Sequence, residues 1–297
     1  MNSKALKLIK QAQTVSQTAK LSQKMVYHDS RVHFKVPKSE KQKEIESIQS
    51  AKSYSFPHPI WSKDEVEDCK VTIKDRVTFG DHCAYYFVNS LRLGFDVMSG
   101  YKRIFPWQDK NVSERTWINR LLFLETVAGV PGFVGAMIRH LRSLRQMKRD
   151  QGWIHTLLEE AENERVHLIT FLNVKEPSKL FRFGVIAAQF WYVGLFFSIY
   201  MLFPRVAHRG VGYLEEQAVI TYTHLIEEIR KENSPVSHWK TEPAPKIAAE
   251  YWNLGEKATL EDVVLAIRKD EEHHKEVNHS LGDDYSQNMP NPYPPGY

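Results

Sequence analysis

The sequence has 297 residues, which fits one large domain or two small ones, and 42% of them are hydrophobic, ample for a buried core. The net charge of +4, with basic and acidic residues mixed along most of the chain, gives no sign of nucleic-acid binding. The two cysteines, Cys69 and Cys83, form no CxxC pair and so indicate neither a zinc site nor a disulfide framework.

The N-terminal segment, residues 1–28, has the composition of a mitochondrial presequence. Lysines, serines and threonines are frequent in it, and the first acidic residue of the chain is Asp29. The first arginine, Arg31, comes late for a presequence, and a basic, disordered tail is the alternative interpretation. Residues 29–70 are expected to form an extended N-terminal arm.

Long helical patterns dominate from Val77 onward, and no alternating run bounded by Asn-Gly or Asp-Gly turns predicts a strand. The expected fold is therefore all-α, with prolines and Gly210 separating the helices. The predicted helices are, in chain order, 77–101, 114–145, 150–173, 179–204, 210–231 and 258–280. The helical domain is expected to span 71–282, and the proline-rich tail 283–297 to be a solvated strap.

Three Glu-x-x-His pairs occur on these helices. The two residues of such a pair lie on one helical face, and iron or manganese accepts their mixture of carboxylate and imidazole. Each pair alone is more typical of a solvated helix face than of a metal site. The pairs are Glu164 with His167, Glu271 with His274, and Glu276 with His279.

The order of the acidic helices makes a metal site more probable than any single pair does. A di-iron four-helix bundle takes one Glu from each of two helices and a Glu-x-x-His pair from each of the other two. The same two-helix unit is used twice here, which predicts a ferritin-like bundle with two similar metal positions. The chain supplies, in order, Glu125, Glu164 with His167, Glu215, and Glu271 with His274.

The surroundings of the single acids differ. Glu125 is the one charged residue in the stretch 121–138, where a carboxylate is costly to bury unless a cation pairs with it. The alternative is a glutamate that points to solvent. Glu215 lies next to Glu216, and adjacent acids in the first turn of a helix are also favoured by the macrodipole. Glu276 and His279 are expected to be surface residues just past the site.

Polar residues directly precede two of the pairs. Asn163 precedes Glu164, and Asp270 precedes Glu271. Groups that accept the free imidazole N–H are expected around such a site. Helix capping or plain exposure is the alternative for both residues.

Four sequence blocks resemble the signatures of the alternative oxidases. They are LETVAGVPG (124–132), NERVHL (163–168), LEEQA (214–218) and DEEHHKEVNH (270–279), and the resemblance covers about 70 to 280. Those enzymes are monotopic proteins of the inner mitochondrial membrane that oxidise ubiquinol and reduce oxygen to water without pumping protons, which bypasses the cytochrome pathway. The resemblance implies two iron ions held by Glu125, Glu164, His167, Glu215, Glu271 and His274.

The resemblance also implies roles for further residues. Tyr222 matches a tyrosine beside the metals that is a candidate for redox activity, although a packed core tyrosine would look identical. Asn163, Asp270 and His208 match positions that support the ligands. The quinol pocket would be lined by Arg120, Leu124, Leu214, Ala218 and Thr221, which as bare residues pass for ordinary core and one surface arginine.

Two departures from the family pattern stand out. The third acid of the family's Leu-Glu-Glu-Glu-Ala block is Gln217 here, which leaves the number of metal ligands unchanged because Glu215 is the expected ligand. Neither Cys69 nor Cys83 lies in the regulatory cysteine context of plant members. Redox control by a disulfide and a keto acid is therefore not expected.

The segment 183–204 carries no charged side chain and would make a helix of about 33 Å, long enough to cross a bilayer core. In a ferritin-like bundle this segment is the crossover between the second and third bundle helices, which run parallel. If it spanned the bilayer, the flanking helices would start on opposite sides. We therefore expect it to lie in one leaflet beside helix 77–101, with Arg182, Arg205 and Arg209 meeting lipid phosphates.

The expected function is thus a quinol oxidase of the inner membrane, facing the matrix and forming a homodimer. A desaturase-like hydroxylase would use the same ligands with an external reductant and an acyl or ring substrate, and a plastid terminal oxidase would use plastoquinol. The alternative without catalysis is a ferritin-like iron-storage or structural protein, which has no use for a 22-residue uncharged helix.

Overall fold

The computed structural model describes residues 56–101, 112–175, 177–285 and 289–296, all within the unit Gln49–Tyr297. The predicted presequence and most of the predicted arm lie outside the described residues. Within these ranges the fold is all-α, as predicted, with one isolated β-bridge. Its elements are α3 (Lys63–Glu67), α4 (Phe79–Met98), α5 (Glu114–Gln146), α6 (Trp153–Val174), α7 (Lys179–Leu202), α8 (Pro204–Arg230), the 3-10 helix η3 (Ser237–Lys240), α9 (Lys246–Tyr251) and α10 (Leu260–Asp283).

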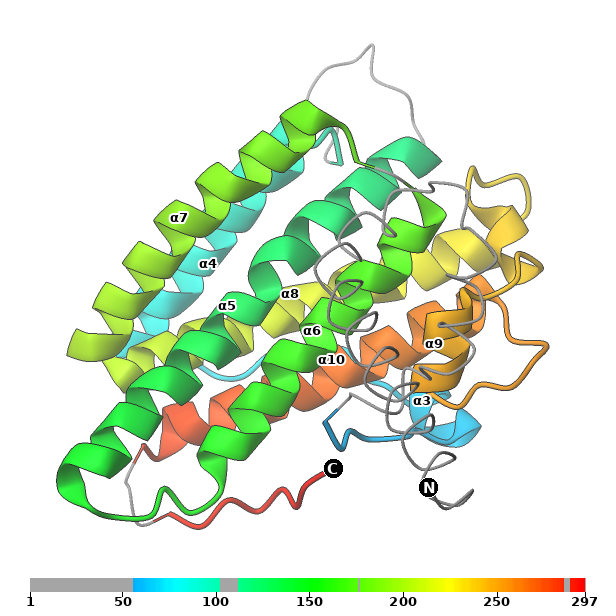
Figure 1. Cartoon of the computed structure of the whole chain (residues 1–297). Helices are drawn as coiled ribbons and strands as arrows, with labels where there is room; N and C mark the ends of the chain where they lie inside the picture. The colour runs from blue at the N-terminus through cyan, green and yellow to red at the C-terminus, as the bar shows by residue number, and fades with distance from the viewer. Residues whose placement is uncertain (1–55, 102–111, 176, 286–288, 297) are drawn as a thin grey trace, which may run out of the picture. The chain divides into compact units, whose positions relative to one another are not determined.

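Four of these helices form the bundle (Figure 1). Helices α5 and α6 pack as one hairpin, and α8 and α10 pack as the other. Helix α7 leads from the end of α6 to the start of α8 and lies along the outside, in contact with α5 and α8. Helix α4 packs on α8, on the same side of the bundle as α7. The predicted arrangement of two hairpins and one crossover is confirmed.

Local sequence explains where these helices begin. Thr78 and Asp81 form a capping box at the start of α4, and Thr259 and Asp262 form another at the start of α10. Serine side chains cap the first turns of α5 and α7. Each cap satisfies backbone N–H groups that have no partner inside the helix.

The predicted start of the fifth long helix was wrong. That helix, α8, begins at Pro204 rather than at 210, and only Phe203 separates it from α7. Proline interrupts a helix interior but is tolerated in the first turn, where its missing N–H costs no hydrogen bond. The short elements α3, η3 and α9 were not predicted at all.

Glycines bring α5 and α6 together beside the site. A Cβ at Gly132 would lie 2.6 Å from the Leu157 carbonyl oxygen, and one at Gly129 would lie 3.1 Å from the Ala161 carbonyl oxygen. Both glycines belong to the predicted block 124–132. The helix continues through Pro131. The close approach of the backbones holds Glu125 of α5 next to Glu164 of α6.

Helices α4 and α7 expose large apolar side chains. Only 11% of the most apolar window of α7 is buried, whereas the other helix that is long and apolar enough to cross a membrane, α5, is half buried in the bundle. The exposed side chains of α7 include Leu180, Phe183, Ile186, Phe190, Trp191 and Leu202, and those of α4 include Phe79, Tyr86, Phe87, Leu91 and Leu93. The two helices thus give one side of the described chain an apolar surface.

One basic residue assigned to this surface lies elsewhere. Arg209 is buried and forms ion pairs with Asp81 and Asp283, so the expectation that it meets lipid phosphates was wrong. Its partners come from the start of α4 and the end of α10, which helical periodicity in α8 does not reveal. Arg205 is exposed and donates to the Gly282 and Asp283 carbonyl oxygens, at 3.2 and 2.7 Å.

The described C-terminal tail packs on α6. In the described tail, 289–296, Met289 accepts a hydrogen bond from the Trp153 indole at 3.0 Å, and Asn291 donates to Thr156 at 2.7 Å. These contacts attach the described tail to α6, while its four prolines are exposed.

Candidate metal centre

The six predicted ligands converge inside the bundle. Each is at most 6% exposed, in a protein interior where an isolated charge is costly. Helix α5 supplies Glu125, α6 supplies Glu164 and His167, α8 supplies Glu215, and α10 supplies Glu271 and His274. The solvent-facing alternative for Glu125 is wrong, since this side chain is 6% exposed.

Four of these side chains form a tight group. Glu125, Glu164, His167 and Glu271 each offer one ligand atom within 4.8 Å of the others. His167 Nδ1 lies 3.4 Å from Glu125 Oε2, 3.3 Å from Glu164 Oε2 and 3.5 Å from Glu271 Oε1. A single cation in this space would have three carboxylates and an imidazole around it.

The other two predicted ligands extend this group. His274 Nδ1 lies 2.9 Å from Glu164 Oε1 and 4.0 Å from Glu271 Oε2. Burial raises the pKa of Glu215 well above its ordinary value, and the charges of Glu271 and Glu164 add to that effect. Glu215 also lines the same cavity as Glu125 and Glu271, so it lies beside the group.

Burial and the repulsion between neighbouring carboxylates disfavour the ionised forms of Glu125 and Glu215. Burial raises the pKa of Glu125 to about 8, with the nearby Glu164 and Glu271 carboxylates contributing. Burial alone would lower the pKa of His274, but its contact with Glu164 raises it to about 9. In the absence of metal, protons on these groups replace part of the missing positive charge.

Unpartnered atoms show that the site fits metal ions. Among the described residues, Glu125 Oε2, both Glu164 oxygens, His167 Nδ1 and His274 Nδ1 are buried and make no hydrogen bond of good geometry, although they face one another at 2.9 to 3.4 Å. Buried polar atoms are nearly always satisfied, so a cluster of such orphans indicates a missing ligand. Four carboxylates and two imidazoles are donors that iron or manganese accepts.

Asp270 orients one of the imidazoles. Its Oδ2 lies 3.2 Å from His167 Nε2 and accepts hydrogen bonds from Asn163 Nδ2 at 2.9 Å and Trp252 Nε1 at 2.8 Å. Trp61 Nε1 donates to Oδ1 at 2.6 Å. Because these bonds fix the carboxylate, His167 presents Nδ1 to the centre. Trp61 and Trp252 were missed, since no spacing links the arm or α9 to α10.

His208 supports the centre only indirectly. Its Nδ1 lies 2.9 Å from Asn278 Oδ1, and its Nε2 lies 2.9 Å from the Tyr200 hydroxyl. Asn278 in turn donates to Glu160 Oε2 at 2.9 Å. Burial lowers the pKa of His208 to about 3, so the imidazole is neutral.

Tyr222 touches the ligand group directly. Its hydroxyl donates a hydrogen bond to Glu125 Oε1, and the side chain is 2% exposed. Burial and the charge of Glu125 raise the pKa of the phenol well above its ordinary value. Tyr222 therefore keeps its proton beside the carboxylate.

An apolar cavity of about 340 Å³ leads to the same group. All five residues predicted for the quinol pocket line it: Arg120, Leu124, Leu214, Ala218 and Thr221. Glu125, Glu215, Glu271 and Tyr222 lie at its inner end, and side chains of α4 and α7 also form its walls. The cavity thus connects the apolar surface with the candidate metal centre.

Arg120 is not the surface arginine that its sequence context suggested. It is 2% exposed, and its Nη2 lies 2.6 Å from Asp96 Oδ1. The guanidinium also lies over the rings of Tyr101 and Phe95, at 4.2 and 4.9 Å from their centroids. Asp96, on α4, was not predicted, because a partner on another helix leaves no local signal.

His279 was wrongly expected at the surface, whereas Glu276 is exposed as predicted. His279 Nε2 lies 2.9 Å from Glu216 Oε1, and the Lys74 backbone N–H donates to the same oxygen at 2.6 Å. Glu216 is therefore engaged outside the centre, which leaves Glu215 as the acid of α8 that faces the other ligands.

Comparisons with known proteins agree with this geometry. The family model described as "Alternative oxidase" matches residues 61–283. The chain is similar to "Alternative oxidase, mitochondrial" of Aspergillus niger, with 44% identity over 248 residues, 82% of this chain and 70% of the relative. The corresponding protein of Ajellomyces capsulatus is 42% identical over 272 residues, 89% of this chain and 74% of the relative. That of Emericella nidulans is 46% identical over 233 residues, which are 77% of this chain and 65% of the relative.

Proposed function

The chain belongs to the alternative oxidase family, and on that premise we propose that it is a ubiquinol oxidase that reduces dioxygen to water at a di-iron centre without pumping protons. The observation that carries the proposal is the apolar cavity, which ends at the buried carboxylates. Such a cavity suits a lipid-soluble reductant rather than a soluble electron carrier.

The proposed ligands are the four glutamates and two histidines of the centre. When bound, the two irons would supply the electron-transfer chemistry between quinol and dioxygen. Asp270 holds His167 in one orientation, and the Tyr222 hydroxyl holds Glu125. Tyr222 is a candidate to donate a proton, an electron or both, because it touches a ligand and also lines the cavity.

The cavity would hold the quinol ring. Arg120 and Thr221 supply polar groups, while Leu124, Leu214 and Ala218 supply apolar walls. Each quinol gives two electrons and two protons, and dioxygen needs four of each, so two quinols are oxidised in one turnover. The Asp96 carboxylate keeps the Arg120 guanidinium in place beside the ring.

The apolar side formed by α4 and α7 supports binding to one leaflet of a membrane. Both helices expose aromatic and aliphatic side chains, and the cavity opens between them and the bundle. Quinol could therefore reach the centre from the lipid phase without crossing water. The names of the relatives support a mitochondrial location. We place the protein on the matrix-facing leaflet of the inner membrane.

We also propose a homodimer. Helix α5 exposes an apolar stripe of its own at Phe133, Met137, Leu141 and Leu144. A stripe of this kind on a helix that is otherwise packed in the bundle is typical of a protein interface.

Oxygen uptake by purified, lipid-reconstituted protein tests the function. Adding reduced ubiquinone should start uptake, with two quinols consumed for each dioxygen and about two irons bound per chain. A desaturase-like hydroxylase would take up oxygen only with its own substrate and an external reductant. Iron binding without any quinol-dependent uptake would contradict the proposal and favour a storage role.

A further inference from the structure

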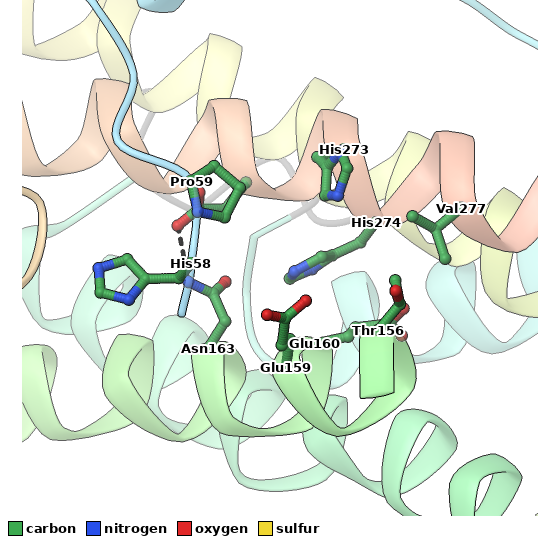
Figure 2. Close-up of a pocket in the computed structure, with 10 residues that line it drawn as sticks. His58, Pro59, Thr156, Glu159, Glu160, Asn163, His273, His274 and Val277 are labelled. Carbon is green, nitrogen blue, oxygen red and sulfur yellow. Dashed lines mark hydrogen bonds between the residues drawn. The ribbon is translucent and has the colours of Figure 1, made fainter. Parts of the chain in front are cut away.

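A second, much smaller cavity lies between α6 and α10 and is drawn in Figure 2. Its volume is about 20 Å³, roughly the space of one water molecule. It reaches the centre from a side different from that of the apolar cavity, whose walls come from α4, α5, α7 and α8 in addition to Glu271. Its polar lining comes from Glu159, Glu160, Asn163, Asp270, His273 and His274.

An unpartnered acceptor lines this cavity. Asn163 is 4% exposed, and its Oδ1 has no hydrogen-bond partner among the described residues. The amide nitrogen donates to Asp270 at 2.9 Å and to the Tyr251 hydroxyl at 3.1 Å, which fixes the side chain. Figure 2 shows Asn163 and His274 on facing sides of the cavity. A buried oxygen held in this way indicates a missing partner, either a cation or a water molecule.

Carboxylates continue from this point toward the surface. Glu160 is 4% exposed, belongs to none of the predicted ligands and accepts from Asn278 at 2.9 Å. Glu159, one residue earlier, lies 3.3 Å from the ring of His155, a side chain that is 41% exposed. At the inner end, His274 Nδ1 lies 2.9 Å from Glu164. Glu159, Glu160 and His274 thus line one cavity, which has the partly exposed His155 near one of these residues and Glu164 of the centre near another.

We propose that this cavity is the route by which metal ions reach the centre, with Glu159 and Glu160 as transient ligands. The inference rests on the metal centre of the proposed function. A divalent cation must exchange its water ligands for protein oxygens and nitrogens as it moves inward. Several carboxylate, amide and imidazole side chains line this small cavity, whereas the walls of the quinol cavity are mainly hydrocarbon.

Described residues of the arm and of the C-terminal tail cover the opening of this route. From the arm, His58 lies over Tyr251 with ring centroids 3.6 Å apart, and its Nε2 lies 2.7 Å from the Tyr251 carbonyl oxygen. From the tail, the Gly296 N–H donates to Glu159 Oε1 at 3.0 Å, and the ring of Tyr293 lies 5.2 Å from that of His273. A one-water space is too small for a hydrated cation, so these segments must open during uptake.

Metal uptake by the apoprotein tests the route without quinol or oxygen. Chelator-treated, detergent-solubilised full-length protein is mixed with Co²⁺, and the absorption of bound cobalt is followed with time. The double variant Glu159→Gln, Glu160→Gln should slow uptake by about tenfold or more, because clefts of one charge raise cation on-rates by roughly 10 to 10³. The final amount of bound metal should stay the same, since both residues lie outside the ligand set.

Three further variants make the test specific. Glu162→Gln, on the same helix but outside the cavity, should leave the rate unchanged, as should Ala218→Leu, which narrows the quinol cavity. Tyr293→Ala should speed uptake by about threefold or more, because a loosened tail opens more often. An unchanged rate in the double variant, or slowing by Ala218→Leu, overturns the route. Absence of metal binding in the unaltered chain overturns the centre as well, whereas metal binding without quinol oxidation overturns only the proposed function.

Discussion

The hydroxyl of Tyr222 donates a hydrogen bond to Glu125, across the interface between α8 and α5. One phenol therefore touches a candidate metal ligand while it also forms part of the wall of the apolar cavity.

Replacing this hydroxyl should separate a catalytic role from a packing role. We expect Tyr222→Phe to lower quinol-dependent oxygen uptake by about a hundredfold, within the usual range for loss of a proton-transfer group, while iron content stays unchanged. Tyr213→Phe is a matched control on the same helix, because Tyr213 is buried and its hydroxyl has no hydrogen-bond partner among the described residues. Equal turnover in the two variants would make Tyr222 a packing residue.

Removal of a single ligand should empty the centre while the bundle stays folded. Glu125→Ala and Glu271→Ala each delete a carboxylate from the group whose ligand atoms lie within 4.8 Å of one another. Both variants should lose bound iron, measured per chain, and keep most of their helical circular dichroism. Glu276→Ala, at an exposed position on α10, should keep the metal. Full iron content in either ligand variant would show that the assignment is wrong.

The cavity arginine depends on its partner. Asp96→Asn removes the charge that lies 2.6 Å from the Arg120 guanidinium and leaves that buried cation without its anionic partner. Breaking a buried pair in this way costs about 3–5 kcal/mol of the free energy of unfolding. Lys246→Gln removes an exposed charge and should change stability by less than about 0.5 kcal/mol. Similar unfolding midpoints for the two variants in detergent would contradict the prediction.

The close contact of α5 with α6 should make Gly132 irreplaceable. A Cβ there would lie 2.6 Å from a backbone oxygen, so Gly132→Ala must separate the helices that carry Glu125 and Glu164. Overpacking of this kind costs about 1–3 kcal/mol, and bound iron should fall with it. Gly94→Ala, at a helical position with nothing within 4 Å, should instead be neutral or stabilising by up to about 1 kcal/mol. Thermal unfolding and iron content are measured for both variants. Equal values in the two would contradict the prediction.

The predicted ligands, which the structure brings together, could be picked out of the sequence because their signals are local. A Glu-x-x-His pair fixes two side chains on one helical face, and Glu125 stands alone in an apolar stretch. The contacts that were not predicted join segments that are distant in the sequence. Asp96 beside Arg120, Arg209 between two acids, and Trp61 on Asp270 all pair residues from separate helices or from the arm. No periodicity within one helix records such a partner.

The start of α8 was missed for another reason. Proline stops a helix in its interior but is well suited to the first turn, so Pro204 by itself is compatible with both positions. In the structure Pro204 lies in the first turn of α8, and one residue separates α7 from α8. This short connection matters for the proposed membrane binding, because it ties the end of the apolar helix directly to a bundle helix.

The position of α7 in the membrane provides the last prediction. A helix that lies in one leaflet keeps both of its ends on the same side of the membrane, whereas a spanning helix separates them. Lys179 and Arg205 are exposed at the two ends of α7, and single cysteines there, in a background without Cys69 and Cys83, report on each end. An impermeant thiol reagent applied to sealed inner-membrane vesicles should label both positions or neither, according to the orientation of the vesicles.

The same vesicles test what holds the protein on the membrane. Because apolar side chains of α4 and α7 supply most of the contact, high salt should leave the protein bound and detergent should release it. If the reagent instead reaches one end of α7 from one side of the membrane and the other end from the opposite side, α7 spans the bilayer. In that case α6 and α8, which carry Glu164 and Glu215, would begin from opposite sides, and the bundle that brings these two residues together could not form in one aqueous compartment.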